Sequence, residues 1–309
     1  MADKAVITGG AGFIGSHLAD RLLSLGQEVV ILDNLSSGFI ENIPPSARLV
    51  RGDATDPTVV AQAVEGASTV YHLAAVASVQ AGIDNPLHSH AACGTSALVV
   101  GDNARRAGVR RVVYAASASA YGIPKGPIQT EEDPLAPRST YAAAKLAGEL
   151  HLVALGETHG LETVRLRFFN VFGPRQRADS PYSGVIALFA NALLAGRQPT
   201  ILGDGLQTRD FVHVSDVVSA LVAAGTAPAA CGTVCNIGTG RATSLLDLLA
   251  TLSSVIGVEP KPQFAQARQG DIRHSCANIT RANQLLGYQP RVSLREGLAD
   301  TVSWMRSRP

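Results

Sequence analysis

Two residues that could perform proton chemistry, Tyr141 and Lys145, lie four positions apart in STYAAAKLAGELHLVAL, a stretch with a helical pattern. Residues at this spacing share one face of a helix, so the phenol and the ammonium are expected to be neighbours. A phenol has a reference pKa of about 10, and a nearby positive charge lowers that pKa. Ser117, at the serine-rich end of VRRVVYAASASAYG, could hydrogen-bond the hydroxyl that Tyr141 deprotonates. Because YxxxK is also common as a surface pair, the interpretation depends on the elements around it.

The N-terminal region predicts the structure that would position these groups. KAVIT (4–8) is predicted to form a buried strand, SHLADRLLSLG (16–26) a helix, and QEVVILDN (27–34) a second strand. A glycine-rich turn joins the first strand to the helix. Strand, turn, helix and strand form one βαβ unit, which predicts an α/β fold with a doubly wound parallel sheet.

The glycines of this turn have the spacing of a dinucleotide-binding motif. Gly9 permits the tight turn, Gly12 lets the backbone approach a pyrophosphate, and Gly15 lets the helix pack closely on the strand. The N-terminus of the helix would offer free N–H groups to the phosphates. Asp33, at the end of the second strand, would bind the adenosine ribose and repel a 2′-phosphate, which favours NAD over NADP. The alternative is a structural glycine turn with a surface aspartate.

Two further strand ends are predicted to border the same crevice. RLVRGDATD leads into Asp53, which could hydrogen-bond the adenine amino group or cap the following helix. STVYHLAAVAS ends at His72 and three small or apolar residues that would let a nucleotide lie flat: Leu73, Ala74 and Ala75. His72 itself has strand residues as neighbours and is expected to pack rather than to catalyse.

Composition excludes several classes of protein. The 309 residues are 46% hydrophobic and 17% charged, with a net charge of +1 and no long basic run, so no nucleic-acid partner is expected. No transmembrane stretch or signal peptide is expected. Four sparse cysteines are typical of reduced thiols, and the sequence therefore favours a cytoplasmic location. CGTVC could bind a metal by its spacing, but no histidine or second cysteine pair lies near it, so no metal site is expected.

Several residues and motifs together carry a resemblance to a known family: TGGAGFIG, Asp33, HLAA, the Ser117 strand, the Tyr141–Lys145 pair and RFFNVFGPRQ. With them the chain resembles the extended short-chain dehydrogenase/reductase family over essentially its whole length. Two longer stretches are similar to the nucleotide-sugar epimerases of that family, of the UDP-glucose 4-epimerase type. They are SPYSGVIALFANALLAGRQPTILGDGLQTRDFVHVSDV and ARQGDIRHSCANITRA. The resemblance implies a Rossmann-type NAD-binding domain, 1–170 with about 208–238, and a smaller mixed nucleotide-sugar-binding domain, 171–207 with 239–309.

The resemblance also implies binding roles. Phe13 and Ile14 would cover the pyrophosphate, the loop from Asn34 to Gly38 would surround the ribose, and Phe169 would lie by the nicotinamide. The expected cofactor-binding residues are Gly9, Gly12, Phe13, Ile14, Gly15, Asp33, Asn34, Ser36, Ser37, Gly38, Asp53, Ala54, Leu73, Ala74, Ala75, Tyr141, Lys145 and Phe169. The expected substrate-binding residues are Ser117, Tyr141, Asn170, Val185, Leu202, Arg209, Arg268, Asp271 and Ser275. Among them the arginines suit a diphosphate, which a guanidinium binds through two parallel hydrogen bonds.

The expected reaction is inversion of C4 of a UDP-hexose through a 4-keto sugar. Relatives that eliminate water or carbon dioxide carry an acidic residue two places before the tyrosine that is Tyr121 here, and this chain has Ser119 in that place. Strict glucose enzymes carry a bulky tyrosine where this chain has Ser275, so UDP-N-acetylglucosamine is expected to be accepted beside UDP-glucose and UDP-galactose.

Three other functions remain open: a reductase that releases reduced cofactor, a 4-epimerase for a sugar acid or a dTDP sugar, and a dinucleotide-sensing protein without catalysis. Relatives carry an asparagine where this chain has Ala91, so permanent retention of NAD is less secure. Apolar outer faces on the helices after Pro86 and Tyr141 suggest a homodimer with a four-helix contact, as in relatives.

Overall fold

The computed structural model describes residues 3–177, 184–267 and 272–307, and its centre is a parallel seven-stranded sheet with the order β11-β6-β5-β4-β1-β2-β3. The strands are β1 (Lys4–Thr8), β2 (Glu28–Asp33), β3 (Arg48–Arg51), β4 (Thr69–His72), β5 (Arg111–Ser117), β6 (Glu162–Phe168) and β11 (Val234–Ile237). The near-continuous apolar runs of β1, β2 and β5 are typical of strands that are covered on both faces. The predicted doubly wound α/β fold is confirmed.

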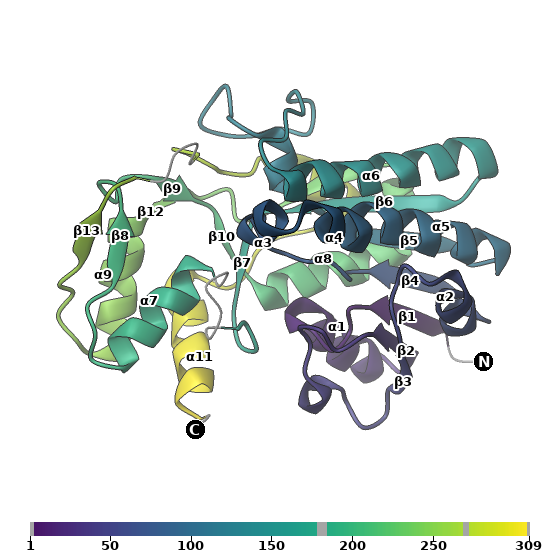
Figure 1. The fold of residues 1–309 in the computed structure, drawn as a ribbon, viewed down its shortest axis with the longest axis horizontal. Helices are drawn as coiled ribbons and strands as arrows, with labels where there is room; N and C mark the ends of the chain where they lie inside the picture. Colours follow the sequence, from purple (N-terminus) through teal and green to yellow (C-terminus); the bar gives the residue numbers. More distant parts are fainter. Residues whose placement is uncertain (1–2, 178–183, 268–271, 308–309) are drawn as a thin grey trace.

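Helices cover both faces of this sheet (Figure 1). On one face, α1 (Phe13–Ser24), α8 (Val214–Thr226) and α10 (Thr280–Leu286) pack with β1 and β2 in one apolar cluster. On the other, α2 (Pro57–Val64), α5 (Ser96–Arg106) and α6 (Thr140–His159) form a second cluster. Each leucine that is fully buried there contributes about 1.5–3 kcal/mol relative to exposure, and these two cores hold the strand ends in place.

The first helix begins earlier than its sequence pattern predicts. It starts at Phe13 instead of residue 16, because Gly12 is the extended N-cap residue from which the helix opens. It ends at Ser24, and Gly26 reverses the chain with a positive φ of 78°. The glycine turn therefore leads directly into the first helical turn, where the N–H groups point toward the turn.

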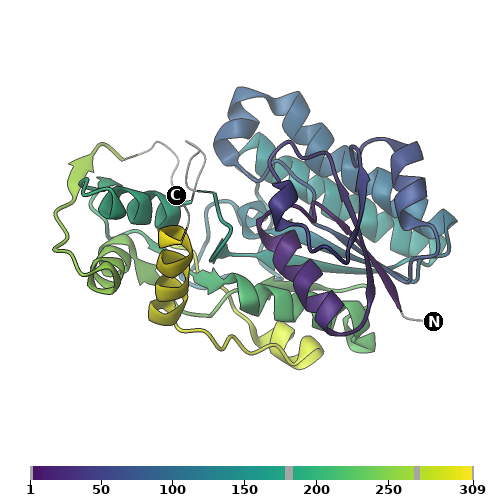
Figure 2. The same cartoon turned by 90° about the horizontal axis from the view of Figure 1, so that it is seen from below.

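A smaller part of the molecule stands beside the sheet (Figures 1 and 2). Its core is an apolar cluster of three helices, α7 (Val185–Leu194), α9 (Leu245–Ile256) and α11 (Leu294–Arg306). Three two-stranded sheets accompany them: β7 (Asn170–Phe172) with β10 (Phe211–His213), β8 (Thr200–Leu202) with β13 (Gln263–Ala265), and β9 (Thr208–Arg209) with β12 (Thr243–Ser244). The remaining short elements are η1 (Ile40–Asn42), α3 (Val79–Asp84), α4 (Pro86–His90), the π-helical segment η2 (Ala91–Thr95), η3 (Ala118–Tyr121) and η4 (Pro228–Ala230).

The predicted division into two discontinuous domains stays a prediction, and the cores add one observation to it. Strand β11 and helix α8, which lie within 208–238, belong to the large sheet and its cover. Ala282 and Tyr288, which lie in the range predicted for the second domain, also pack in the cluster on the large sheet. The chain therefore returns to the first part a second time through α10.

The helices and side-chain clusters of the three described ranges bear on membrane insertion, metal binding and disulfide formation. None of the helices there has the length and apolarity needed to cross a bilayer. No group of three or more histidine, cysteine or acidic side chains is arranged there to hold a metal ion. The four cysteines are free thiols, and Cys231 is the exposed one.

Candidate active site

The predicted site residues follow the carboxyl ends of the central strands. β1 pairs with β2 on one side and with β4 on the other, so the connections from these strands diverge at this point. In doubly wound sheets, ligands bind in the crevice at such a switch point. Gly9, Asp33, Leu73, Ser117 and Phe169 end or directly follow five strands and therefore meet at one edge of the sheet.

The glycine turn is packed too closely for side chains. Gly9 has a φ of +72°, and a Cβ there would lie 2.8 Å from the Ala74 backbone nitrogen. A Cβ on Gly15 would overlap the Gly9 carbonyl oxygen. Gly12 caps α1 without a side chain, and the first turn of that helix contains no acidic residue. The structure thus forms a backbone cradle at a helix N-terminus, which fits a dinucleotide pyrophosphate.

Asp33 is fixed by the turn that it faces. Its Oδ2 accepts a hydrogen bond from the Ala11 N–H at 3.0 Å, and its Oδ1 accepts one from the Leu35 N–H at 2.8 Å. Each carboxylate oxygen has a second lone pair that can accept a hydroxyl. The carboxylate therefore ties the glycine turn to the loop after β2 while keeping acceptor capacity for a ribose.

Asp53 lies beside that loop and does not cap a helix. Its Oδ2 accepts a hydrogen bond from Asn34 Nδ2 at 2.8 Å, and its Oδ1 accepts bonds from the Thr55 backbone and hydroxyl. Burial raises the pKa of Asp53, but these hydrogen bonds outweigh it and the pKa is lowered. The N-cap of α2 is Asp56, so the alternative interpretation of Asp53 as the cap is wrong.

The other residues expected to contact the cofactor lie around this cradle. Leu73 N–H donates to the Thr8 carbonyl at 3.1 Å, and Ala74 N–H donates to Thr8 Oγ1 at 3.2 Å, so the segment after β4 is held against β1. A Cβ on Gly38 would lie 2.8 Å from the Ala11 Cβ, which places the loop after β2 against the glycine turn. The remaining members occupy the first turn of α1, the loops after β2, β3 and β4, and the end of β6: Phe13, Ile14, Ser36, Ser37, Ala54, Ala75 and Phe169. Their binding roles stay predictions.

Ser117, Tyr141 and Lys145 meet where β5 ends beside the first turns of α6. The helix opens at Ser139, whose hydroxyl accepts a hydrogen bond from the Ala142 N–H. Ser117 lies close enough to the Tyr141 phenol to lower its pKa. Lys145 is buried, and its Nζ donates to the Ala115 carbonyl at 2.6 Å on the same strand. The serine and the tyrosine are thus neighbours, and the lysine is anchored one helical turn away.

The lowered pKa expected for Tyr141 needs the positive nicotinamide ring as well as Lys145, and the protein's own groups alone do not produce it. Burial raises the pKa of Tyr141, and the proximity of Ser117 only partly offsets that effect. Burial also lowers the pKa of Lys145. Both shifts have the same cause, because a group removed from water loses the hydration of its charged form. The protein's own groups therefore leave the phenol protonated, and an additional positive charge is needed to make it a base.

The predicted substrate residues line the edge of the smaller part. Asn170 and Val185 share a pocket of about 30 Å³ between β7 and the start of α7. Leu202 is half-exposed at the end of β8, and Arg209 lies on β9 with its Nη1 donating to the Thr208 carbonyl. The Ser275 N–H donates to the same Thr208 carbonyl at 3.2 Å. Arg268 and Asp271 lie outside the described residues.

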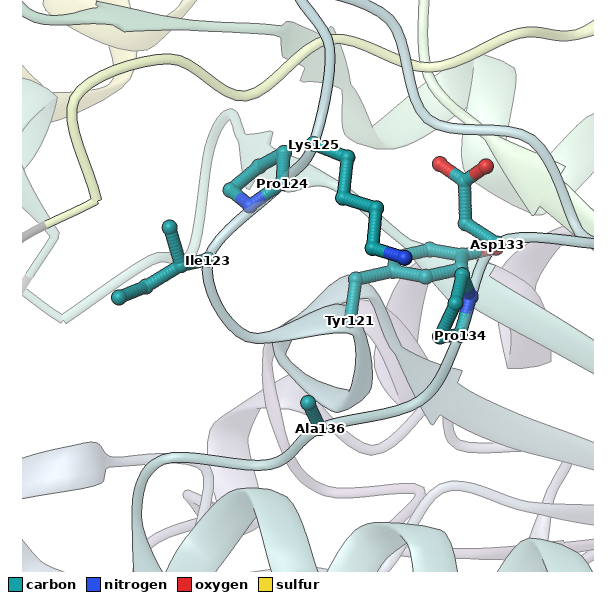
Figure 3. A pocket seen from close by; sticks show the side chains of 7 residues that line it. All are labelled: Tyr121, Ile123, Pro124, Lys125, Asp133, Pro134 and Ala136. Carbon is teal, nitrogen blue, oxygen red and sulfur yellow. The ribbon is translucent and has the colours of Figure 1, made fainter.

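A second, larger pocket of about 60 Å³ lies against the ring of Tyr121, and Figure 3 shows its lining side chains. They are Tyr121, Ile123, Pro124, Lys125, Asp133, Pro134 and Ala136. None of them belongs to the residues predicted for cofactor or substrate. We therefore place the chemistry at the strand ends, where the phenol and the serine meet, and not in this pocket.

Sequence reasoning missed two features beside the site. One is the π-helical segment η2, which packs against α6, and π-helical turns are frequent at functional sites. The other is the buried ion pair of Glu149 with Arg167 at 2.6 Å. Glu149 follows Lys145 by four residues, so the sequence could have shown that Glu149 shares a helix face with Tyr141 and Lys145. No pattern in the sequence identifies Arg167 as its partner.

Comparison with known proteins agrees with this geometry. The family model described as "NAD dependent epimerase/dehydratase family" matches residues 5–238. A UDP-glucose 4-epimerase of Mycolicibacterium smegmatis is 41% identical, with 99% of each chain covered. Relatives at 31% and 33% identity include a UDP-glucuronic acid decarboxylase and a dTDP-glucose 4,6-dehydratase.

Solved structures agree along the whole chain. The UDP-glucose 4-epimerase of Thermotoga maritima with UDP-glucose has a TM-score of 0.95 at 35% identity, covering 98% of this chain and 99% of its own. The UDP-N-acetylglucosamine 4-epimerase of Methanobrevibacter ruminantium M1, in complex with UDP-N-acetylmuramic acid, also has a TM-score of 0.95, at 34% identity with 99% of both chains covered. Because sequence and fold match over nearly the full length, and the glycine cradle fits a dinucleotide, this chain is an enzyme of the NAD-dependent epimerase/dehydratase family, with NAD as its cofactor.

Proposed function

We propose that this enzyme inverts C4 of UDP-hexoses, interconverting UDP-glucose and UDP-galactose and also their 2-N-acetyl counterparts. The observation that carries the proposal is the proximity of Ser117, which lowers the pKa of the Tyr141 phenol, at the strand edge that also holds the glycine cradle. That arrangement supports a role for Tyr141 as the proton acceptor beside the expected position of the nicotinamide. The similarity to 4-epimerases that act on UDP-sugars supports the choice of substrate class.

The chain's own residues handle the proton and hold the nucleotide. NAD, when bound, supplies a hydride acceptor and donor, and its positive ring adds to the Lys145 charge that favours the phenolate. Tyr141 accepts the O4 proton while Ser117 orients that hydroxyl by a hydrogen bond. Tyr141 then returns the proton to the same oxygen after the flat 4-keto sugar has turned over. Asn170 and Arg209 would hold the diphosphate, so the hexose alone is free to rotate.

Elimination is disfavoured by the residues between β5 and Tyr121. The Ser119 hydroxyl forms a hydrogen bond of 2.8 Å with Ser117 and has no acidity near neutral pH. A decarboxylase or dehydratase needs a second acid–base group for the neighbouring carbon, and this position offers none. Oxidation and reduction at C4 alone require only Tyr141 as the acid–base group.

The direct test is incubation of the purified enzyme with UDP-glucose and, separately, with UDP-N-acetylglucosamine, followed by chromatography of the products. We expect the C4 epimer in both reactions without net formation of NADH, since each turnover regenerates the cofactor. Parallel reactions with added NAD control for loss of cofactor during purification. This control is needed because Ala91 stands where relatives carry an asparagine. Steady consumption of NAD, or no epimer from either sugar with NAD present, would refute the proposal.

Ser275 is expected to set tolerance of the N-acetyl group. It is half-buried beside Thr208, and a larger side chain there would fill the space that a 2-N-acetyl group needs. Ser275→Tyr is expected to lower kcat/KM for UDP-N-acetylglucosamine by about 10–200-fold while changing that for UDP-glucose much less. Ser275→Ala is the matched control. An equal loss on both sugars would show that Ser275 does not face the 2-substituent.

We also propose a homodimer formed through α5 and α6, which lie side by side on one face of the sheet (Figure 1). Leu98 on α5 and Leu150 on α6 are exposed, as is Leu87 on α4. Exposed apolar side chains on neighbouring helices are typical of an interface. Sedimentation should give twice the chain mass, and Leu150→Glu should give a monomer. A monomeric wild-type protein at micromolar concentration would contradict this.

A further inference from the structure

Helix α6 carries three ionisable side chains at intervals of four residues: Tyr141, Lys145 and Glu149. Lys145 and Glu149 are both buried, with exposed fractions of 4% each. Opposite charges at this helical spacing are within reach of one another. Here the ammonium donates instead to the Ala115 carbonyl at 2.6 Å, so the carboxylate needs another partner.

That partner is Arg167 on β6. Its Nη2 donates to Glu149 Oε1 at 2.6 Å, and its Nε donates to Glu149 Oε2 at 3.1 Å, so both carboxylate oxygens are engaged by one guanidinium. Such bidentate pairs fix geometry as well as charge. The remaining guanidinium nitrogen, Nη1, donates to the Tyr121 hydroxyl at 2.9 Å.

Tyr121 and Asn236 hold the guanidinium in place from its other side. The Tyr121 hydroxyl donates to Asn236 Oδ1 on β11 at 2.6 Å, and the guanidinium lies 4.9 Å from the centre of the Tyr121 ring. Asn236 in turn donates from Nδ2 to the Gln129 carbonyl at 3.0 Å. The network therefore fixes the Arg167 guanidinium, and with it the Glu149 carboxylate, close to β6 and β11. Its members come from separate segments of the chain.

We propose that Arg167 is a positioning residue that holds the Glu149 carboxylate away from Lys145, so that the ammonium remains available to the phenol of Tyr141. This inference rests on the proposed function for the roles of Tyr141 and Lys145. Without the guanidinium, the carboxylate would form its ion pair with the ammonium one helical turn away. The positive charge beside Tyr141 would then be neutralised, and the phenolate would lose its stabilisation.

Several other titratable groups lie near the pair of Lys145 and Glu149. Those that face Lys145 or Glu149 from neighbouring elements are His72 on β4, Cys93 on η2, Tyr114 on β5, Tyr121 on η3, and Arg165 and Arg167 on β6. Burial lowers the pKa of His72 to about 3, so its imidazole is neutral and cannot replace the ammonium. Arg165 is engaged by Thr163 Oγ1 at 3.2 Å and the Gly232 carbonyl at 3.0 Å.

The test is a rescue experiment on the titration of Tyr141. The NAD-loaded wild type, Arg167→Met and the double variant Glu149→Gln with Arg167→Met are titrated by ultraviolet difference spectroscopy, each against the same protein carrying Tyr141→Phe. Arg167→Met is expected to raise the pKa of Tyr141 by about one unit, which means about tenfold less phenolate at neutral pH. The double variant removes the competing carboxylate and should return the titration to the wild-type position.

A matched control separates this effect from loss of a buried ion pair in general. Arg111 on β5 pairs with Glu162 on β6 at 2.7 Å and is also buried, but at the amino ends of the two strands, opposite the site. Arg111→Met is expected to lower the melting temperature without moving the Tyr141 titration. If Arg167→Met does not fold, Arg167→Lys keeps the charge but cannot hold both carboxylate oxygens, and it is expected to shift the titration in the same direction.

An unchanged Tyr141 titration in the Arg167 variant would overturn the inference, and so would a double variant that keeps the displaced titration. The spectroscopic readout needs no sugar substrate. A failure of the proposed epimerase activity would therefore appear as missing product with the titrations still as expected, which distinguishes it from a failure of this inference. Where epimerisation is observed, the pH–rate profile should shift in parallel with the titration.

Discussion

Replacing Tyr141 by phenylalanine is expected to lower kcat for epimerisation by about 10²–10⁴-fold, the usual contribution of a positioned general base. The phenol lies near Ser117 at the end of β5, and the substitution removes only its oxygen. NAD should remain bound, because the glycine cradle is untouched. The measurement is kcat on UDP-galactose together with the NAD content of the purified variant.

Tyr288→Phe is the matched control for this variant. The Tyr288 hydroxyl is also buried and donates to the Gly238 carbonyl at 2.8 Å, so its removal costs a comparable hydrogen bond away from the reacting group. We expect it to reduce stability by about 0.5–1.5 kcal/mol and to leave kcat within a few-fold of the wild type. A Tyr141→Phe enzyme with most of its activity would remove the tyrosine from the mechanism.

The second large effect is expected at Gly15. A Cβ there would overlap the Gly9 carbonyl oxygen and lie 2.8 Å from the Gly10 Cα, so Gly15→Ala must push α1 away from the turn. Overpacking of this kind costs about 1–3 kcal/mol, and the displaced N–H groups would no longer meet the pyrophosphate. We expect NAD affinity to fall at least about tenfold, the equivalent of about 1.4 kcal/mol, in a calorimetric titration.

Gly126→Ala provides the comparison for this substitution. A Cβ on Gly126 has no heavy atom within 4 Å and its φ is not positive, so the substitution has no steric cost. NAD affinity and melting temperature should stay at wild-type values. If Gly15→Ala bound NAD as tightly as Gly126→Ala, the turn would not be the pyrophosphate site.

The sequence predicted the sheet and the strand ends because these depend on local patterns. The run KAVIT and the glycine turn could be read together as β1 and the turn that follows it, since each pattern spans only a few residues. Spacing by four likewise placed Tyr141 and Lys145 on one helix face, and the structure has both on α6. The start of α1 was missed because the N-cap is Gly12, which has no capping side chain for the sequence to show.

Features that depend on contacts between distant segments could not be predicted in this way. Arg167 meets Glu149 because β6 lies beneath α6, and no local pattern states which arginine faces which carboxylate. The raised pKa of Tyr141 follows from burial by several elements, whereas the sequence showed only the nearby lysine. The return of Ala282 and Tyr288 to the large core is likewise a tertiary effect.

The most direct measurement of the mechanism uses UDP-galactose that carries deuterium at C4. If Tyr141 handles only the O4 proton while C4 loses and regains its hydrogen as a hydride within one site, the UDP-glucose formed should keep all of its deuterium at C4. Mass spectrometry of the product, with the reaction run in ordinary water, reads this directly. Loss of the label to solvent would show that C4 is deprotonated or that an elimination intervenes, and it would contradict the mechanism.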